Sequence, residues 1–217
     1  YEHVHNQIEY SPWHGSRAGA LTTLQARRGN DVDIASALIA LLRARDVPAR
    51  YAVGTIRLPV SKLKRWLRIP QLDTALEVLR AQGTQQLRLS SDRANVDLEH
   101  AWVEALLPLA PYRGGTQGPA SPPCTESEAG QRCHWVSLDA SFKQYALPTA
   151  PIDPSPAISF DYNAYYNALR TNDRLRRDRA PLAILEDQIG AWLRTEKPGR
   201  SLSEVADNGT LLELHEG

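Results

Sequence analysis

The longest regular pattern of hydrophobic and polar positions lies in residues 28–51. Apolar side chains recur there every three or four residues, namely at Ile34, Ala35, Leu38, Ile39, Leu41 and Leu42. This spacing predicts a helix that is buried on one side and presents Arg43 and Arg45 to solvent. Gly29-Asn30 predicts a turn before the helix, and Asp31 stands where a side chain can accept a bond from the free amides of the first turn.

Alternating apolar and polar residues predict three strands and a shorter fourth one. They cover residues 50–58, 97–107, 135–139 and, for the short strand, 87–89. Side chains two residues apart in a strand point the same way, so His100, Trp102 and Glu104 are expected on one face of the second strand. The long loop 108–133 leads into the third strand, which we expect to form a hairpin with the second.

Further helices are expected before, between and after these strands. Their patterns cover residues 1–10, 18–25, 61–67, 71–82, 161–170 and 181–194. The pair within 61–82 forms a helical insertion, for which we expect a packing role, with a wall over a cleft as the alternative. C-terminal helices at 160–195 follow a proline-rich linker at 148–156, and a polar tail at 196–217 contains a group of leucines whose partner the sequence does not identify.

Charge and composition exclude some classes of function. Lys plus Arg and Asp plus Glu both number 25 among 217 residues, so no overall field attracts nucleic acid or an anionic membrane. No segment approaches the length of an apolar membrane span, and Tyr1-Glu2-His3 does not open a signal peptide. Because the chain contains no methionine, we expect it to be part of a larger polypeptide, and its length favours one sizeable domain.

Cys124 and Cys133 are the two cysteines of the chain, and both lie in the long loop. A disulfide across this loop is the expected state and would favour an oxidising compartment, whereas two free thiols are the alternative. A zinc site is not expected, because His134 is the one further ligand beside them.

Three blocks of sequence occur in a fixed order along the chain. They are the helix start with its exit LLRARDVPARY, then Glu99 to Glu104 (EHAWVE), and then Trp135 to Phe142 (WVSLDASF). The blocks resemble the nucleophile helix, the histidine strand and the aspartate strand of the transglutaminase-like superfamily. This resemblance covers roughly residues 1–195 and implies one α+β domain with a papain-like fold, in which a central helix packs on an antiparallel sheet.

A narrower resemblance rests on the aspartate at the helix start and on residues 111–114 (PYRG) and 141–145 (SFKQY). These features look like the transglutaminase-like domains of bacterial Rhs-repeat-associated secreted proteins. The resemblance implies a secreted, periplasmic or cell-surface location.

The superfamily uses a Cys-His-Asp triad, and the resemblance assigns each position of that triad to a residue of this chain. Asp31 falls on the nucleophile position, His100 on the base and Asp139 behind it, so the thiol is absent. Trp13 and His14, on the loop before the helix, and Trp102 are implied as substrate-binding residues of the cleft. The resemblance implies no cofactor.

Three roles are open to Asp31. It can act with a protonated His100 on a water, hydroxyl or amine, as an atypical hydrolase or acyl transferase for peptide or protein substrates. It can be an inert helix cap in a catalytically inactive binding module. It can hold a metal ion together with His100 and Asp139. Two carboxylates beside one histidine should raise its pKa and keep it protonated, which favours an ion pair over a simple base. We expect the enzyme, with the binding module as the alternative and without a metal.

Overall fold

Two compact units make up the part of the chain that the structure describes. The structure is a computed structural model, and it describes residues 1–108, 123–130, 132–147, 152–154, 156–171, 179–205 and 209–214. The first unit contains residues 1–147 and 210–217, and the second contains residues 148–209. The expected limits, a domain at 1–195 and a tail at 196–217, divide the chain elsewhere and stay a prediction. Most of the expected loop 108–133, with the PYRG block, lies outside the described residues.

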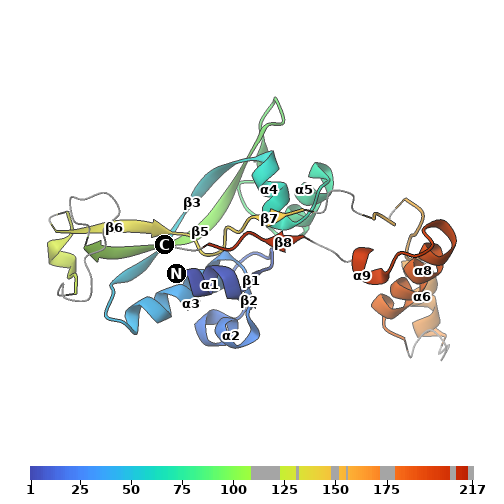
Figure 1. Ribbon diagram of the computed structural model, residues 1–217, viewed down its shortest axis with the longest axis horizontal. Coiled ribbons are helices and arrows are strands. Elements are labelled where there is room, and N and C mark those ends of the chain that lie inside the picture. The colour runs from blue at the N-terminus through green and yellow to red at the C-terminus, as the bar shows by residue number, and fades with distance from the viewer. Residues whose placement is uncertain are drawn as a thin grey trace. The chain divides into compact units, whose positions relative to one another are not determined.

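An antiparallel sheet is the centre of the first unit. Its two long strands, β3 (Ala49–Pro59) and β5 (Asn95–Pro108), pair along the whole length of β3 (Figure 1). The other edge of β5 pairs with two shorter strands, β4 (Arg88–Leu89) and β6 (Cys133–Leu138). β5 and β6 therefore form the expected hairpin, and the α+β class with an antiparallel sheet is confirmed.

The central helix is α3 (Asp31–Arg43), and it buries the side that the sequence pattern predicts. Its buried side chains are Asp33, Ile34, Ala35, Ala37, Leu38 and Ile39. Leu41 was expected in the core but is exposed. Asp31 accepts a free amide of the first turn as expected, from Val32 at 2.9 Å. The cap position itself, however, belongs to Asn30, whose side chain accepts the amide of Asp33 at 2.8 Å. Asp31 is the first residue of the helix itself.

The segment before α3 is a strand, not the predicted turn. The N-terminal elements are α1 (Glu2–Gln7), β1 (Glu9–Tyr10), α2 (Gly19–Ala26) and β2 (Arg28–Gly29). β1 and β2 pair in parallel, which fixes the chain that leads into α3. A Cβ at Gly29 would lie 3.0 Å from the Cβ of Asp33 and from Cγ2 of Thr23, so this glycine permits close packing.

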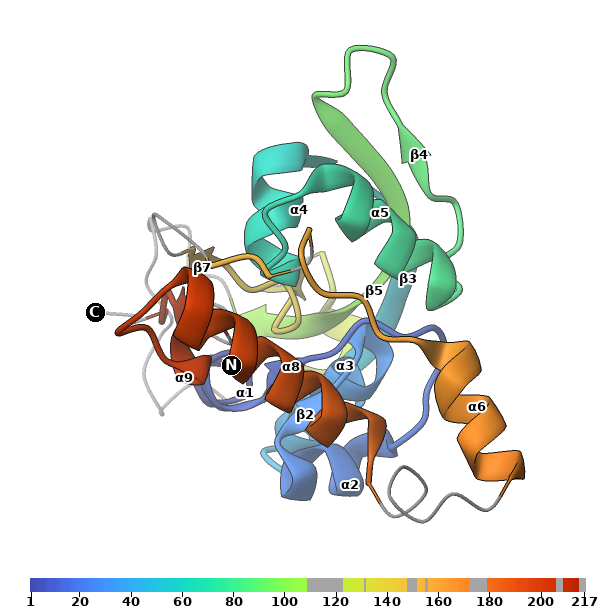
Figure 2. The same cartoon turned by 90° about the vertical axis from the view of Figure 1, so that its right-hand side faces the viewer.

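Helices cover the two faces of the long strands at different ends (Figure 1). Val103 of β5 packs with α3, whereas Leu98 packs with the insertion helices α4 (Val60–Leu67) and α5 (Leu72–Ala81). Odd and even positions of a strand point to opposite faces, so the two groups of helices lie on opposite faces of the sheet. α4 and α5 lie side by side (Figure 2).

The edge of β5 that carries β4 and β6 is interrupted. The two short strands pair with opposite ends of β5 and leave residues 98–102 between them. In this interval the amide of Glu99 donates to the carbonyl of Gln85 at 2.9 Å. The amide of Ala101 donates to the carboxylate of Asp31, also at 2.9 Å. The start of α3 thus takes the place of a strand at this point.

The end of the chain returns to the first unit. β8 (Thr210–Leu211) pairs antiparallel with β7 (Tyr145–Ala146), and the amide of Leu212 donates to the carbonyl of Gln144. The leucines of the tail, for which the sequence identified no partner, therefore lie in and just after β8, which pairs with β7. Two residues on each side are too few for a pattern of alternation to be visible in the sequence.

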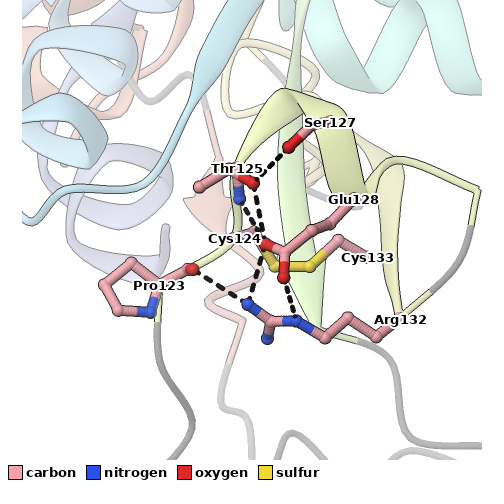
Figure 3. Close-up of a disulfide and its surroundings, with 7 residues drawn as sticks. All are labelled: Pro123, Cys124, Thr125, Ser127, Glu128, Arg132 and Cys133. Carbon is pink, nitrogen blue, oxygen red and sulfur yellow. Dashed lines mark hydrogen bonds and ion pairs between the residues drawn. A yellow bond between two sulfur atoms is a disulfide. The ribbon is translucent and has the colours of Figure 1, made fainter.

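A disulfide between Cys124 and Cys133 closes the end of the β5–β6 hairpin (Figure 3). Both sulfurs pack against Leu106 of β5. Between the cysteines lies the short 3-10 helix η1 (Glu126–Glu128), where Glu128 accepts the Nε of Arg132 at 2.6 Å. Of the two states open in the sequence, the structure has the disulfide.

The second unit is helical in its described part. It contains α6 (Tyr162–Arg170), α8 (Pro181–Glu196) and the short α9 (Leu202–Val205). The first two agree with the helices expected at 161–170 and 181–194. No helix within the described residues is both long and apolar enough to cross a membrane.

Candidate active site

His100 lies at the centre of the site, because both of its ring nitrogens face carboxylates. Nε2 lies 2.9 Å from Oδ2 of Asp139, and Nδ1 lies 3.3 Å from Oδ2 of Asp31. The imidazole is almost completely buried, with 1% of its side chain exposed. Burial alone would lower the pKa of His100, but its hydrogen bonds to Asp139 and Asp31 raise this pKa to about 9. His100 is therefore an imidazolium at neutral pH and is not available as a base.

Asp31 joins the helix start to the interrupted edge of β5. Its Oδ1 accepts the amide of Val32 and its Oδ2 accepts the amide of Ala101, both at 2.9 Å. Together with His100, three donors surround this carboxylate, and the positive end of the helix dipole adds to them. The side chain keeps 17% of its surface exposed. The site thus presents the Asp31 carboxylate to solvent at the helix start, beside the buried imidazole of His100.

Asp139 is fixed by the turn that follows β6. Its Oδ1 accepts the hydroxyl of Ser141 at 2.7 Å and the amides of Ser141 and Phe142 at 3.0 and 3.1 Å. Its Oδ2 is left for His100. Burial would raise the pKa of Asp139, but the bond and charge of His100 and the donors of the turn hold it below its usual value. The carboxylate therefore stays ionised and orients the imidazole.

Trp66 of the insertion helix α4 reaches the same site. Its indole nitrogen donates to the carbonyl of Ser141 at 2.8 Å, and its ring meets that of His100 edge-on at 5.2 Å. Tyr10 stacks on the other side of the indole at 4.6 Å. The insertion, for which packing was expected with a wall over a cleft as the alternative, thus supports the turn that holds Asp139. The amphipathic pattern of α4 marks Trp66 as buried, but nothing in it identifies what the ring contacts.

A cavity of about 160 Å³ opens beside Asp31. It is lined by Tyr10, Trp13, His14, Gly15, Asp31, Val32, Val53, Thr84, Gln85, Leu98, Glu99, His100 and Ala101. The expected substrate-binding residues Trp13 and His14 both lie in this wall. Trp13 Nε1 is buried and has no hydrogen-bond partner among the described residues, so the indole lines the cavity with its ring and not with this donor. Glu99 and Val53 also line the cavity and were not identified from the sequence.

Trp102, the third expected substrate-binding residue, does not line this cavity. Its indole lies over Gly54 of β3, where a Cβ would come within 3.2 Å of the ring. His100 lies on the same face of β5, but its side chain points toward the edge away from β3, where Asp31 and Asp139 lie. Alternation along a strand predicts the face of a side chain, but it does not predict toward which edge the side chain leans.

Asp33, two residues after Asp31, points away from the site. Its buried carboxylate accepts the hydroxyl of Ser16 at 2.8 Å and the amide of Gly19 at 3.1 Å, with two further amides of the same loop. Burial would raise the pKa of Asp33, but these donors lower it. Asp33 thus anchors the loop that follows Trp13. Within the described residues, no group of three or more His, Cys, Asp or Glu side chains is arranged to hold a metal ion.

Comparison with known proteins gives one match. The family model described as the transglutaminase-like superfamily matches residues 1–140, which include all three residues of the Asp31–His100–Asp139 site. No curated protein and no solved structure matches the chain. The match covers the first two blocks from which the resemblance was drawn and most of the third, and it ends at Ala140, one residue after Asp139.

Proposed function

The chain belongs to the transglutaminase-like superfamily, and we propose that it acts on a peptide or protein substrate as a hydrolase or acyl transferase of altered mechanism. One observation carries the proposal. Asp31 pairs with His100, which in turn pairs with Asp139, and the same Asp31 carboxylate lines the cavity. The three side chains are thus paired in series, as in a catalytic triad, but the first of them is a carboxylic acid.

Asp31 acts in this proposal as a base toward a water or an amine, and not as a nucleophile. A carboxylate attacks an amide weakly and would form a reactive anhydride. Among the described residues, Oδ1 of Asp31 accepts the amide of Val32 alone, which leaves a lone pair for the proton of the attacking group. The acid formed in this way returns the proton to the leaving amine when the tetrahedral intermediate collapses, so protons balance without a covalent enzyme intermediate.

Two further groups assist this reaction. His100, held as an imidazolium between the two aspartates, fixes the orientation of the Asp31 carboxylate. Trp13 lines the cavity with its ring, while its Nε1 is buried, and the ring is suited to packing against the peptide substrate. Because no acyl-enzyme forms, the acceptor must bind at the same time as the amide substrate.

The proposal is tested with a library of acetylated peptides in ¹⁸O-labelled water, with products analysed by mass spectrometry. The wild type is expected to release peptides that carry one ¹⁸O in the new carboxylate, or to join two peptides when an amine is present. Asp31→Asn is expected to lose at least 100-fold in rate, on the order of the effect of a general base. Glu104→Gln serves as control, since Glu104 lies on the same strand but pairs with Arg50 and does not line the cavity. Absence of any product from the folded wild type would reject the proposal.

A second candidate function is a catalytically inactive module that binds peptides in this cavity. The observation in its favour is that both oxygens of Asp31 already accept backbone amides, so the carboxylate also ties α3 to β5. Binding without product, undiminished in Asp31→Asn, would favour this candidate over the enzyme.

An exported location is also proposed for the chain. The Cys124–Cys133 disulfide supports it, because disulfides of this kind persist in oxidising compartments. Mass spectrometry of the protein isolated from its host, without reductant, tests whether the disulfide forms there. A fully reduced pair would count against export.

A further inference from the structure

Glu99 is a charged residue of the cavity wall to which the proposed reaction assigns no role. It lies on β5 next to His100, and it lines the cavity together with Asp31, Val53 and Ala101. Its backbone amide is bonded to Gln85, which fixes the strand at this point. Its carboxylate forms no ion pair with any described residue. An unpaired carboxylate in a cavity wall is a binding group for a ligand cation.

Two arginines are diagonal neighbours of Glu99 on this face of the sheet, Arg88 in β4 and Arg57 in β3, and among the described residues neither forms an ion pair with it. Arg57 is its diagonal neighbour across the β3–β5 pair, but it binds Asp97 through two bonds, Nε to Oδ1 at 2.7 Å and Nη2 to Oδ2 at 2.8 Å. A bidentate pair of this kind uses the planar end of the guanidinium for one partner. The residue directly opposite Glu99 is Thr55, which carries no charge.

The balance of charge at the cavity is negative. Among the residues that line the cavity, Asp31 and Glu99 contribute two carboxylates, and the buried imidazolium of His100, which also pairs with Asp139 behind it, compensates at most one of them. The field in the cavity therefore favours a positively charged ligand group. Val53 lies beside Glu99 with 64% of its surface exposed, and Val32 lies on the other side of Asp31, so apolar surface is present for the stem of a long side chain.

We infer that Glu99 is a specificity-determining residue, which binds a lysine or arginine side chain of the peptide substrate while the reacting amide lies at Asp31. The inference rests on the proposed function for the identity of the ligand as a peptide. It adds the class of side chain that the cavity selects. The cation is recognised and does not itself react.

The experiment measures binding of acetylated and amidated pentapeptides, Ala-Val-X-Val-Ala, in which X is lysine, arginine, norleucine, glutamine or glutamate. Isothermal titration at 50 mM salt is expected to give about fivefold tighter binding of the lysine and arginine peptides than of the norleucine peptide. This ratio should shrink at 500 mM salt, because the pair is partly solvated. Glu99→Gln should bind all five peptides alike, and Glu99→Lys should prefer the glutamate peptide.

Glu104→Gln is the matched control, since Glu104 lies on the same strand but is paired with Arg50 and does not line the cavity. It should keep the wild-type preference. Equal affinity of the wild type for all five peptides, no binding up to 1 mM, or an equal loss in Glu104→Gln would overturn the inference. If the wild type prefers the cationic peptides but forms no product, the inference about Glu99 stands and the proposed reaction is rejected. If it forms product without preferring the cationic peptides, the proposed reaction stands and the inference is rejected.

Discussion

The two carboxylates that face His100 come from regions built in different ways. At the turn after β6, Asp139 is held by donors from its own neighbours, Ser141 and Phe142. At the start of α3, Asp31 is held by Val32 but also by Ala101, which is 70 residues away in the sequence. The first carboxylate is thus positioned by a local turn, and the second by the meeting of a helix with an interrupted sheet edge.

This difference separates a carboxylate fixed by its own turn from one that lines the cavity. Asp139 has 29% of its side chain exposed but does not line the cavity, and all its contacts serve to keep it ionised and in place. Asp31 lines the cavity and keeps a lone pair of Oδ1 without a donor among the described residues. In the proposed reaction, the turn therefore orients the imidazole and the helix start supplies the base.

The largest expected effect concerns the loop anchor at the helix start. Asp33→Ala removes the acceptor of one hydroxyl and three backbone amides, so we expect unfolding free energy to fall by about 4 kcal/mol. Asp33→Asn retains one carbonyl acceptor and should lose less than half of that. Urea denaturation measures both. Equal stability of Asp33→Ala and wild type would show that the helix start is positioned without this anchor.

The next effect is the pH dependence that His100 confers. Its pKa is about 9 in the folded protein and 6.5 in the unfolded chain, so its contribution of about 3 kcal/mol is complete below pH 6.5 and is lost as pH rises through 9. Burial lowers the pKa of Lys143 to about 8, which gives a slope of opposite sign above that pH. The difference between wild type and His100→Gln isolates the histidine.

Unfolding free energies at pH 6, 8 and 10 test this prediction. The gap between the two proteins should be largest at pH 6 and should close by pH 10. A gap that stays constant with pH would mean that His100 is neutral in the folded state. NMR titration of the His100 ring protons gives the pKa directly and serves as the independent check.

The sequence predicts the elements that reach the site better than it predicts their contacts. The periodic helix at 31–43 and the alternating strands were found because each has a long, regular pattern. The pairing of Asp31 with Ala101 depends on a gap between two short strands, and β4 has two residues. Trp66 was missed for the same reason, since a helix pattern shows that a side chain is buried but not what it meets.

The local turn at Asp139 shows the opposite case. Its donors follow within three residues, so the block Asp139-Ala140-Ser141 already contained the interaction. The sequence shows Glu99 next to His100, but it does not show that the Glu99 carboxylate lacks an ion-pair partner among the described residues. Its lack of a partner follows in part from the pairing of Arg57 with Asp97 across two strands, which no single segment encodes.

Removal of the disulfide, at the opposite end of β6 from Asp139, tests whether the strand or the turn positions this residue. The double substitution Cys124→Ser and Cys133→Ser removes a cross-link between residues that are nine positions apart in the sequence. We expect a loss of about 2 kcal/mol in unfolding free energy, because the unfolded chain gains conformational freedom. Because the turn at Asp139 is held by its own donors, the pKa of His100 should stay at about 9. A shift in that pKa would show that the strand end, and not the turn, positions Asp139.

The smallest expected effect compares the two carboxylates directly. Asp139→Asn and Asp31→Asn each remove one charge from the pair around His100, and each is expected to remove part of the about 3 kcal/mol that the raised pKa of His100 contributes to the unfolding free energy. The pKa of His100 should fall further in Asp139→Asn, since Asp139 forms the shorter bond, 2.9 Å against 3.3 Å, and is the stronger cause of the raised pKa. Yet only Asp31→Asn is expected to abolish turnover, because Asp31 alone of the two lines the cavity. NMR titration and peptide turnover on the same samples decide the matter: if Asp31→Asn retains turnover while Asp139→Asn loses it, the reactive carboxylate is the one at the turn.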